Sequence, residues 1–214
     1  MDPTTAIDLY CERSAPGLLA EPLNALSNLA FLIAAVALWR LARRERAGGP
    51  MPALLIALVA VIGVGSAAFH VFANRATLLA DVIPIALFQF VFLGAYARDV
   101  MGWRRVAVMG LLGLFVAASA LAESLPAHWL NGSLGYASAV AFVGWLGWEH
   151  WRARRPEPAL LLAAAGLFLL SLALRTVDNA WCERWPVGTH WAWHLLNGGV
   201  LYLVVRGYVL GRRG

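Results

Sequence analysis

The sequence contains no lysine, and charged residues make up only 14% of its 214 positions. A soluble domain of this size usually carries about 25% charged residues, so this scarcity argues against a water-soluble fold. Apolar residues take the place of charge, because 61% of the chain is hydrophobic and its mean hydropathy is +0.68. All 17 basic residues are arginine, a choice that with the many alanines and glycines is typical of GC-rich bacterial genomes. We therefore expect a protein of a bacterial cytoplasmic membrane.

The first 20 residues also lack the pattern of a cleavable leader. Residues 1–20 carry three acidic side chains and lack a basic stretch followed by an apolar one, so we expect the first apolar run to act as its own insertion signal. The formal net charge of +5 could suit nucleic acid. However, the arginines lie in short segments between apolar runs, where basic residues set membrane orientation, and we expect no nucleic-acid partner.

Seven apolar runs divide the sequence, each near the ~20 residues that cross a ~30 Å hydrocarbon core. The runs cover residues 22–41, 52–72, 79–97, 106–122, 133–151, 159–174 and 189–210. They lack the polar outer face that a water-soluble helix shows at helical period. We therefore predict an all-α membrane protein, a seven-transmembrane-helix bundle that forms a single domain over residues 1–214.

The distribution of arginine predicts how the bundle is oriented. Thirteen of the 17 arginines fall in four places, which are Arg40, Arg43, Arg44 and Arg46; Arg98, Arg104 and Arg105; Arg152, Arg154 and Arg155; and Arg206, Arg212 and Arg213. In a seven-span chain all four places lie on one side of the membrane, and arginine excess marks the cytoplasmic side. We predict an extracytoplasmic N-terminal segment (residues 1–21) and a cytoplasmic C-terminus.

Ionisable side chains inside the apolar runs gather near the extracytoplasmic side. The second run ends with Ser66 and His70 one helical turn apart, the third begins near Asp81, and the last begins with His190 and His194, also one turn apart. Ionisable groups within a membrane are costly and usually mark a functional cavity. Three histidines with an open fourth position are a common arrangement for catalytic zinc, so we predict a metal site. The alternative is a hydrogen-bonded cluster without metal.

The sequence has only two cysteines, Cys11 and Cys182, and both fall outside the membrane in the predicted topology. An even number of cysteines on an oxidising side favours one disulfide. The alternative is a pair of free thiols.

Three stretches of the sequence carry a resemblance to a known family. They are Asp8-Leu9-Tyr10-Cys11-Glu12 with Glu21-Pro22-Leu23-Asn24 and Ser27-Asn28; Gly65-Ser66 with Phe69-His70 and Asp81; and Asp178 and Cys182 with Gly188-Thr189-His190 and Trp193-His194. The spacings S-x-x-x-H, H-x₁₀-D and H-x-x-x-H are specific when they occur together. Along most of its length the chain resembles the alkaline ceramidase family, within a wider superfamily of seven-span hydrolases that includes the adiponectin-receptor-like proteins.

The resemblance implies a zinc amidase that hydrolyses ceramide or a related N-acyl lipid to a sphingoid base and a fatty acid. By this resemblance, His70, His190 and His194 would bind Zn²⁺, and Ser66 and Asp81 would be catalytic. The cysteine pair named above matches the positions of the family's disulfide.

The resemblance also implies a calcium ion over the active site. Its nearest ligand matches are Asp8, Glu12, Glu21 and Asn24. The sequence departs from the family pattern here. Ser14 stands where an asparagine is expected, and the interval from Cys11 to Glu21 is shorter than in the family. The alternative is an acidic, solvated N-terminal segment.

Two other classes of function compete with the enzyme. In one, the chain is a seven-span lipid receptor or sensor with a structural zinc site. In the other it is a channel or transporter, which would place polar residues along a path through the membrane instead of at one depth. Asp81 and Ser66 favour the enzyme, because a structural site has no use for a carboxylate beside an open metal position.

Overall fold

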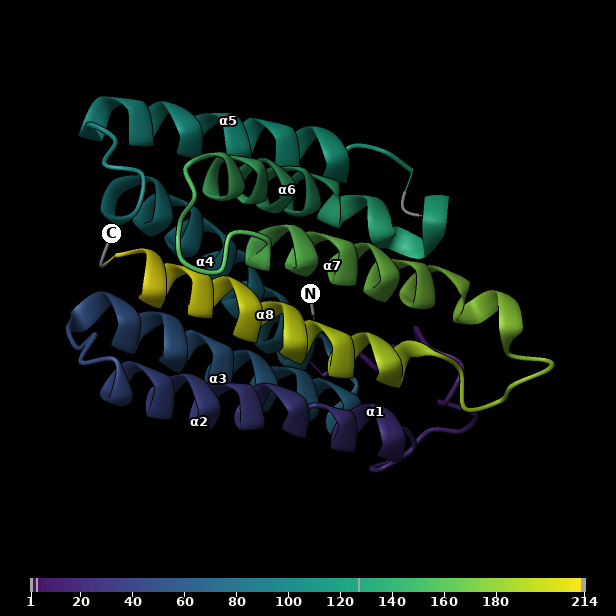
Figure 1. Ribbon diagram of the computed structural model, residues 1–214. Helices are drawn as coiled ribbons and strands as arrows, with labels where there is room; N and C mark the ends of the chain where they lie inside the picture. Colours follow the sequence, from purple (N-terminus) through teal and green to yellow (C-terminus); the bar gives the residue numbers. More distant parts are fainter. Residues whose placement is uncertain (1, 3, 127, 213–214) are drawn as a thin grey trace.

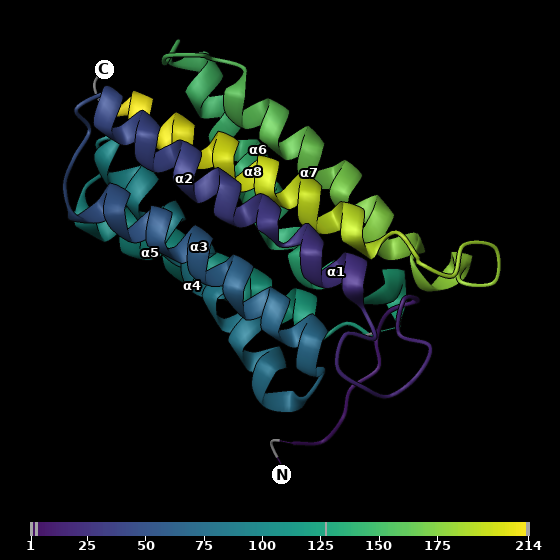
Figure 2. The same ribbon diagram turned by 90° about the horizontal axis from the view of Figure 1, so that it is seen from below.

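The computed structural model describes residues 2, 4–126 and 128–212, and within these the chain is all-helical (Figure 1). Its α-helices are α1 Pro22–Ser27, α2 Leu29–Arg44, α3 Pro50–Phe72, α4 Arg75–Asp99, α5 Arg105–Glu123, α6 Ala137–Arg152, α7 Leu160–Val177 and α8 His190–Gly211. Two 3-10 helices, η1 Trp129–Tyr136 and η2 Asn179–Trp181, lie in the connections. The long helices lie side by side in one bundle, which confirms the predicted all-α class (Figures 1 and 2).

Five segments of the described chain are long and apolar enough to cross a membrane. They are Pro22–Arg44, Pro50–Phe72, Arg75–Asp99, Arg105–Glu123 and Leu160–Val177. The protein is thus a membrane protein by the length and composition of its helices. Helix α6 has only 16 residues, and α8 has 22 but carries two histidines, an asparagine and an arginine. The count of seven spans and the orientation stay predictions.

Two of the predicted runs differ from the observed helices. The run 22–41 is split at Asn28, which separates α1 from α2. There the side chains of Ser27 and Asn28 both donate to the backbone oxygen of Asn24, and such local bonds compete with a continuous helix. The run 133–151 begins too early, because α6 starts only at Ala137, after a 3-10 segment that contains residues with positive φ.

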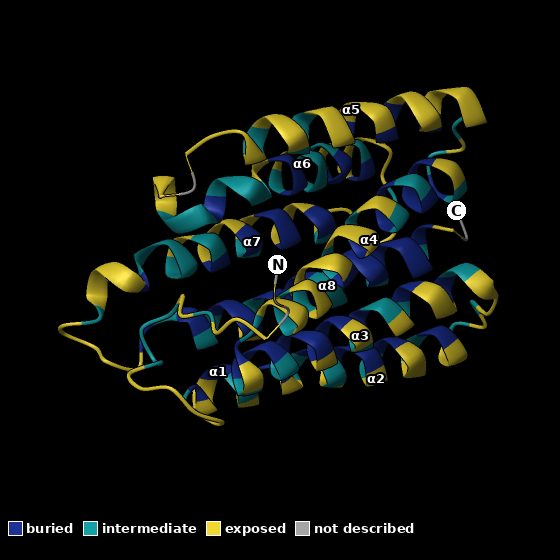
Figure 3. Cartoon of the chain, turned by 180° about the vertical axis from the view of Figure 1, so that it is seen from behind, coloured by how far each residue is buried: buried dark blue, intermediate teal, exposed yellow. Residues whose placement is uncertain are grey.

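Burial in the bundle differs from the pattern in soluble proteins, although its core is mostly apolar. Large apolar side chains face outward, among them Ile33 and Val106, which are 68% and 85% exposed. Figure 3 shows exposed residues along the outer faces of α4 and α5. Histidine and carboxylate side chains such as His70 and Glu21 are instead almost fully buried. An apolar outer surface, with some ionisable side chains held in the interior, suits a bundle that has lipid as its solvent.

The N-terminal segment, residues 4–21, covers one end of the bundle, together with the α7–α8 connection (Figures 1 and 2). Cys11 and Cys182 form a disulfide there, with their Cα atoms 5.2 Å apart, which confirms the predicted bond. Ile7 also donates its backbone N–H to the oxygen of Ala73, in the turn between α3 and α4. We call this end of the bundle the disulfide end.

The opposite end carries the arginine-rich connections between helices. Arg155, in the α6–α7 connection, donates to the backbone oxygen of Val100 after α4, and Arg206 of α8 bonds to Glu157. Connections that are distant in sequence therefore meet at this arginine-rich end, as the spacing of the arginines predicts. Whether this end faces the cytoplasm is a question of orientation, not of fold.

Helices α3 and α4 approach each other closely because position 65 is a glycine. A Cβ atom at Gly65 would lie 2.1 Å from the backbone oxygen of Ala80, so only glycine fits without a shift of the backbone. That oxygen lies four residues before Pro84, which has no N–H to donate to it within the helix. The next residues along each helix, Ser66 and Asp81, are thereby brought to neighbouring positions.

Candidate metal centre

Three histidine side chains meet at the disulfide end of the bundle. His70 comes from the last turn of α3, and His190 and His194 come from the first turns of α8. Their exposed fractions are between 0% and 2%, and one ring nitrogen from each lies within 4.8 Å of the others. The Nε2 atoms of His70 and His194 face each other at 3.2 Å. The predicted convergence of these side chains is therefore confirmed.

The other ring nitrogens have partners suited to metal-binding imidazoles. His70 Nδ1 lies 2.5 Å from the Glu21 carboxylate, and His194 Nδ1 lies 2.7 Å from the Ser27 hydroxyl. Metal-binding histidines usually bond through their second nitrogen to such groups, which fix the ring and its tautomer. The buried Nδ1 of His190 has no hydrogen-bond partner among the described residues. Three imidazoles, two of them oriented and one with an unpartnered nitrogen, fit a zinc ion.

Asp178 positions the first turn of α8 and links it to the N-terminal segment. Its Oδ1 accepts the backbone N–H groups of Thr189 and His190, at 2.6 and 2.9 Å, and its Oδ2 accepts that of Cys11. Gly188 has φ +63°, and a Cβ atom there would lie 2.2 Å from Asp178 Oδ1. Glycine thus permits both the turn and the close approach of the aspartate that caps α8.

Ser66 and Asp81 line the same pocket as His190 and His194. The Oδ1 atom of Asp81 is buried and has no hydrogen-bond partner in the part of the chain that the structure describes. An unpartnered buried carboxylate oxygen is costly and marks a place for a donor that is not part of the protein. Two predicted zinc ligands and both predicted catalytic residues therefore border one pocket.

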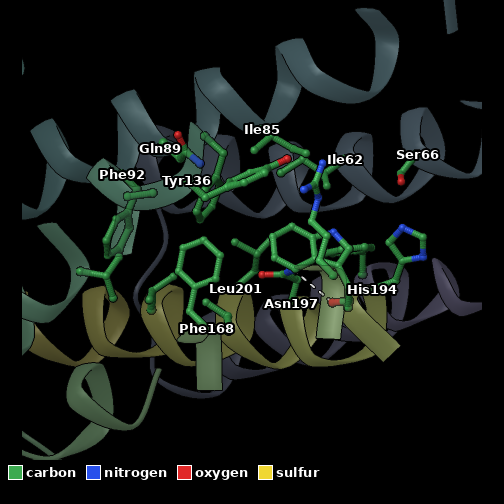
Figure 4. Close-up of a pocket in the computed structure, with 18 of the residues that line it drawn as sticks. Ile62, Ser66, Ile85, Gln89, Phe92, Tyr136, Phe168, His194, Asn197 and Leu201 are labelled. Carbon is green, nitrogen blue, oxygen red and sulfur yellow. Dashed lines mark hydrogen bonds between the residues drawn. The ribbon is translucent and has the colours of Figure 1, made fainter. Parts of the chain in front are cut away.

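The pocket continues from the histidines into the apolar interior of the bundle. Its wall there is mostly aromatic and aliphatic, with two amide side chains, Gln89 and Asn197. The apolar lining residues are Phe31, Ile62, Ile85, Phe88, Phe92, Leu93, Phe115, Ala139, Phe142, Val143, Leu146, Phe168, Val200, Leu201 and Val204. In Figure 4, Ser66 and His194 lie toward one end of the pocket, and Phe92 and Phe168 lie toward the other. A polar end and an apolar end suit an amphipathic molecule with one long hydrocarbon part.

A model of the ceramidase family matches residues 2–210, nearly the whole chain. The chain belongs to the ceramidase family. This confirms the resemblance that the sequence motifs indicated. A comparison with curated proteins gave no match.

In this ceramidase-family chain, an arginine that the motif analysis did not single out also lines the pocket. Arg175, near the end of α7, donates to the backbone oxygen of Asn131 and to the hydroxyl of Ser133. Its guanidinium lies 5.5 Å from the ring of Tyr136 and 5.9 Å from that of Trp193. A charged residue at the end of the apolar run 159–174 was the sequence signal for it.

Three of the four residues predicted to bind calcium lie together, because Glu12 and Glu21 both accept hydrogen bonds from Asn24. Asp8 is exposed. Both carboxylate oxygens of Glu12 accept backbone N–H groups, from Leu23 and Asn24, at 2.7 and 2.8 Å. Glu21 bonds to the metal-site histidine on α3, as described above. Among the described residues, the only group of three or more histidine, cysteine or acidic side chains placed to hold a metal ion is the histidine cluster.

Two groups of the N-terminal segment beside the histidines have shifted pKa values. Burial raises the pKa of the Tyr10 phenol, whose ring stacks on that of His190 with centroids 3.6 Å apart, so this phenol stays neutral. Burial also acts to raise the pKa of Glu21, but hydrogen bonds from His70, Asn24 and Arg13 outweigh it and hold that pKa below its usual value. The Glu21 carboxylate is therefore ionised beside the cluster.

Proposed function

We propose that the chain is a zinc-dependent intramembrane amidase, a single seven-span domain that hydrolyses ceramide or a related N-acyl lipid. The products are a sphingoid base and a free fatty acid. The observation that carries the proposal is a cluster of three buried histidines, two of which line a mostly apolar pocket together with Asp81 and Ser66. Membership of the ceramidase family supports the substrate class.

In this proposal, zinc is held by His70, His190 and His194. When bound, it supplies a Lewis acid for the amide carbonyl and makes a water molecule acidic enough to attack at neutral pH. Neutral imidazoles suit zinc, and the partners of His70 and His194 support binding by their free Nε2 atoms.

The remaining steps of amide hydrolysis fall to side chains of the protein. Asp81 accepts a proton from the attacking water and passes it to the departing sphingoid amine, as a general base and then a general acid. Ser66 donates its hydroxyl to the oxyanion that develops on the amide oxygen. The unpartnered Oδ1 of Asp81 supports the first role, because it is buried and free to bond to water or substrate.

We further propose seven spans, with the disulfide end extracytoplasmic and the arginine-rich end in the cytoplasm. Reporter fusions at Arg46, Arg105 and Arg155 are expected to read cytoplasmic, because arginine-rich connections are retained on that side. A fusion at Glu183, in the α7–α8 connection, serves as the opposite control and is expected to read extracytoplasmic. An outside reading at any of the three arginine positions would break the span assignment.

The proposed activity predicts turnover of a fluorescent ceramide by the purified, zinc-loaded protein. Labelled fatty acid should appear with zinc present, stop after zinc is removed with a chelator, and return when zinc is restored. The measurement is chromatographic separation of the labelled product, with ceramides of different chain and head group run in parallel. Protein that binds zinc and ceramide but releases no fatty acid over many hours would instead support the receptor with a structural zinc site.

A further inference from the structure

The guanidinium of Arg13 lies between the N-terminal segment and the histidine cluster. Its side chain is only 7% exposed, and Nε donates to Glu21 Oε1 at 2.6 Å. One terminal nitrogen donates to the backbone oxygen of His70 at 3.3 Å, and the other to that of Gly17 at 3.4 Å. A single planar cation thus joins the loop before α1 to the end of α3.

Glu21 connects this cation to the proposed zinc site. Its side chain is 1% exposed, and its second oxygen, Oε2, lies 2.5 Å from His70 Nδ1 and accepts from the amide of Asn24 at 3.1 Å. A buried carboxylate is costly unless a counter-charge and hydrogen bonds compensate it. Arg13 supplies that counter-charge and also holds the carboxylate in the orientation that bonds to His70.

Arg13 also holds the backbone of His70 directly. The last four carbonyl groups of an α-helix have no partner within the helix, and α3 ends at Phe72. The bond from the guanidinium to the His70 oxygen satisfies one of these groups, and a cation is favoured at a helix C-terminus. Arg13 therefore fixes the ring of His70 through Glu21, and it fixes the backbone of His70 directly.

The residues that the family resemblance suggested for calcium do not fit that ion here. Calcium takes six to eight oxygen ligands at 2.3–2.6 Å. Both oxygens of Glu21 and both oxygens of Glu12 are already bonded to nitrogen groups of the protein. The buried Oδ1 of Asn24 has no partner and Asp8 is exposed, but one amide oxygen and one exposed carboxylate supply too few ligands for the site.

We propose that Arg13 is a positioning residue that takes the place of a calcium ion, so that the zinc site of this chain is organised without calcium. The planar guanidinium is suited to this place because it bonds in several directions at once, which a lysine ammonium on a flexible stem does less well. The zinc-affinity part of this proposal rests on the proposed zinc site, whereas the calcium part does not.

The first test measures calcium binding to the purified wild-type protein. We expect the thermal unfolding temperature to be the same in millimolar Ca²⁺ as in the same concentration of Mg²⁺, because no site is open to either ion. Turnover at a fixed, buffered concentration of free zinc should be unchanged when calcium is chelated. Stabilisation by Ca²⁺ over Mg²⁺, or loss of activity on calcium removal, would overturn the proposal.

The second test measures zinc affinity by competition with a chelator of known affinity. Loss of a group that orients a metal-binding residue typically costs 10- to 100-fold in metal affinity, so we expect a loss of this size for Arg13→Gln and a smaller one for Arg13→Lys. Arg206→Gln is the matched control, because it removes an Arg–Glu pair near the other end of α8, about 24 Å from His190 at 1.5 Å rise per residue. The control should keep wild-type zinc affinity.

The outcomes of the second test are separable from failure of the proposed function. Unchanged zinc affinity in either folded Arg13 variant would overturn the role of this arginine, and Arg13→Lys decides the question if Arg13→Gln does not fold. If the wild-type protein itself bound no zinc, the proposed function would fail, while the calcium measurement would still stand alone as a test of the inference.

Discussion

Replacing His194 with alanine should remove zinc from the purified protein and reduce ceramide turnover to the background of the assay. Loss of a group that orients a metal ligand already costs 10- to 100-fold in metal affinity, so loss of one of the three ligands should lower zinc affinity at least ~10²-fold. The effect should be larger than that of any other single change proposed for this chain, because the nucleophile and the carbonyl activation both depend on the metal. Elemental analysis of the purified variant measures zinc per chain directly.

The design of this experiment must separate loss of metal from loss of fold. His194 of α8 is buried and bonds to Ser27, the last residue of α1, so its removal also breaks this hydrogen bond. His128→Ala is the matched control, because that histidine is exposed in the α5–α6 connection. Intact Cys11–Cys182 pairing in non-reducing mass spectrometry reports that the disulfide end has formed. Full zinc occupancy in a folded His194→Ala protein would show that the ligand set is wrong.

Much of the fold was predictable because a membrane-spanning helix is a long, nearly continuous apolar run, which is easy to recognise in a sequence. A run such as 52–72 reads as a helix from its length and composition alone, and α3 covers Pro50–Phe72. The histidine cluster was predictable for a related reason, since ionisable groups within apolar runs are rare and the four-residue step places His190 and His194 on one helix face. Both inferences need only the spacing of residues along a single helix and the predicted depth of those residues in the membrane.

The unpredicted features depend on contacts between segments far apart in sequence. Glu21 was interpreted as a calcium ligand, but its bond to His70 joins residues 49 positions apart. Arg13 appears in the sequence as an ordinary arginine of a polar segment, and only the folded chain shows it buried against Glu21. The break at Asn28 was missed because it arises from side chains bonding to the local backbone within an otherwise apolar run.

Asp81→Asn is expected to keep zinc and to lose most of kcat. General acid–base catalysis contributes typically 10²–10⁴-fold, and asparagine has nearly the shape of aspartate but cannot move the proton. The same change at Asp99, which bonds to Arg98 and Tyr208 at the arginine-rich end, is the matched control and should leave kcat unchanged. Measured kcat, KM and zinc content of both variants, with Ser66→Ala for comparison, test the assignment.

The pattern of these three measurements distinguishes a proton carrier from a group that only orients a ligand. If Asp81 moves protons, Asp81→Asn keeps one zinc per chain and a near-normal KM, and excess zinc restores nothing. Ser66→Ala should also keep its zinc and lose about 10²–10³-fold in kcat, because it removes one donor to the oxyanion. If instead Asp81→Asn loses zinc and recovers activity in excess zinc, Asp81 orients a metal ligand. The proton would then need another carrier.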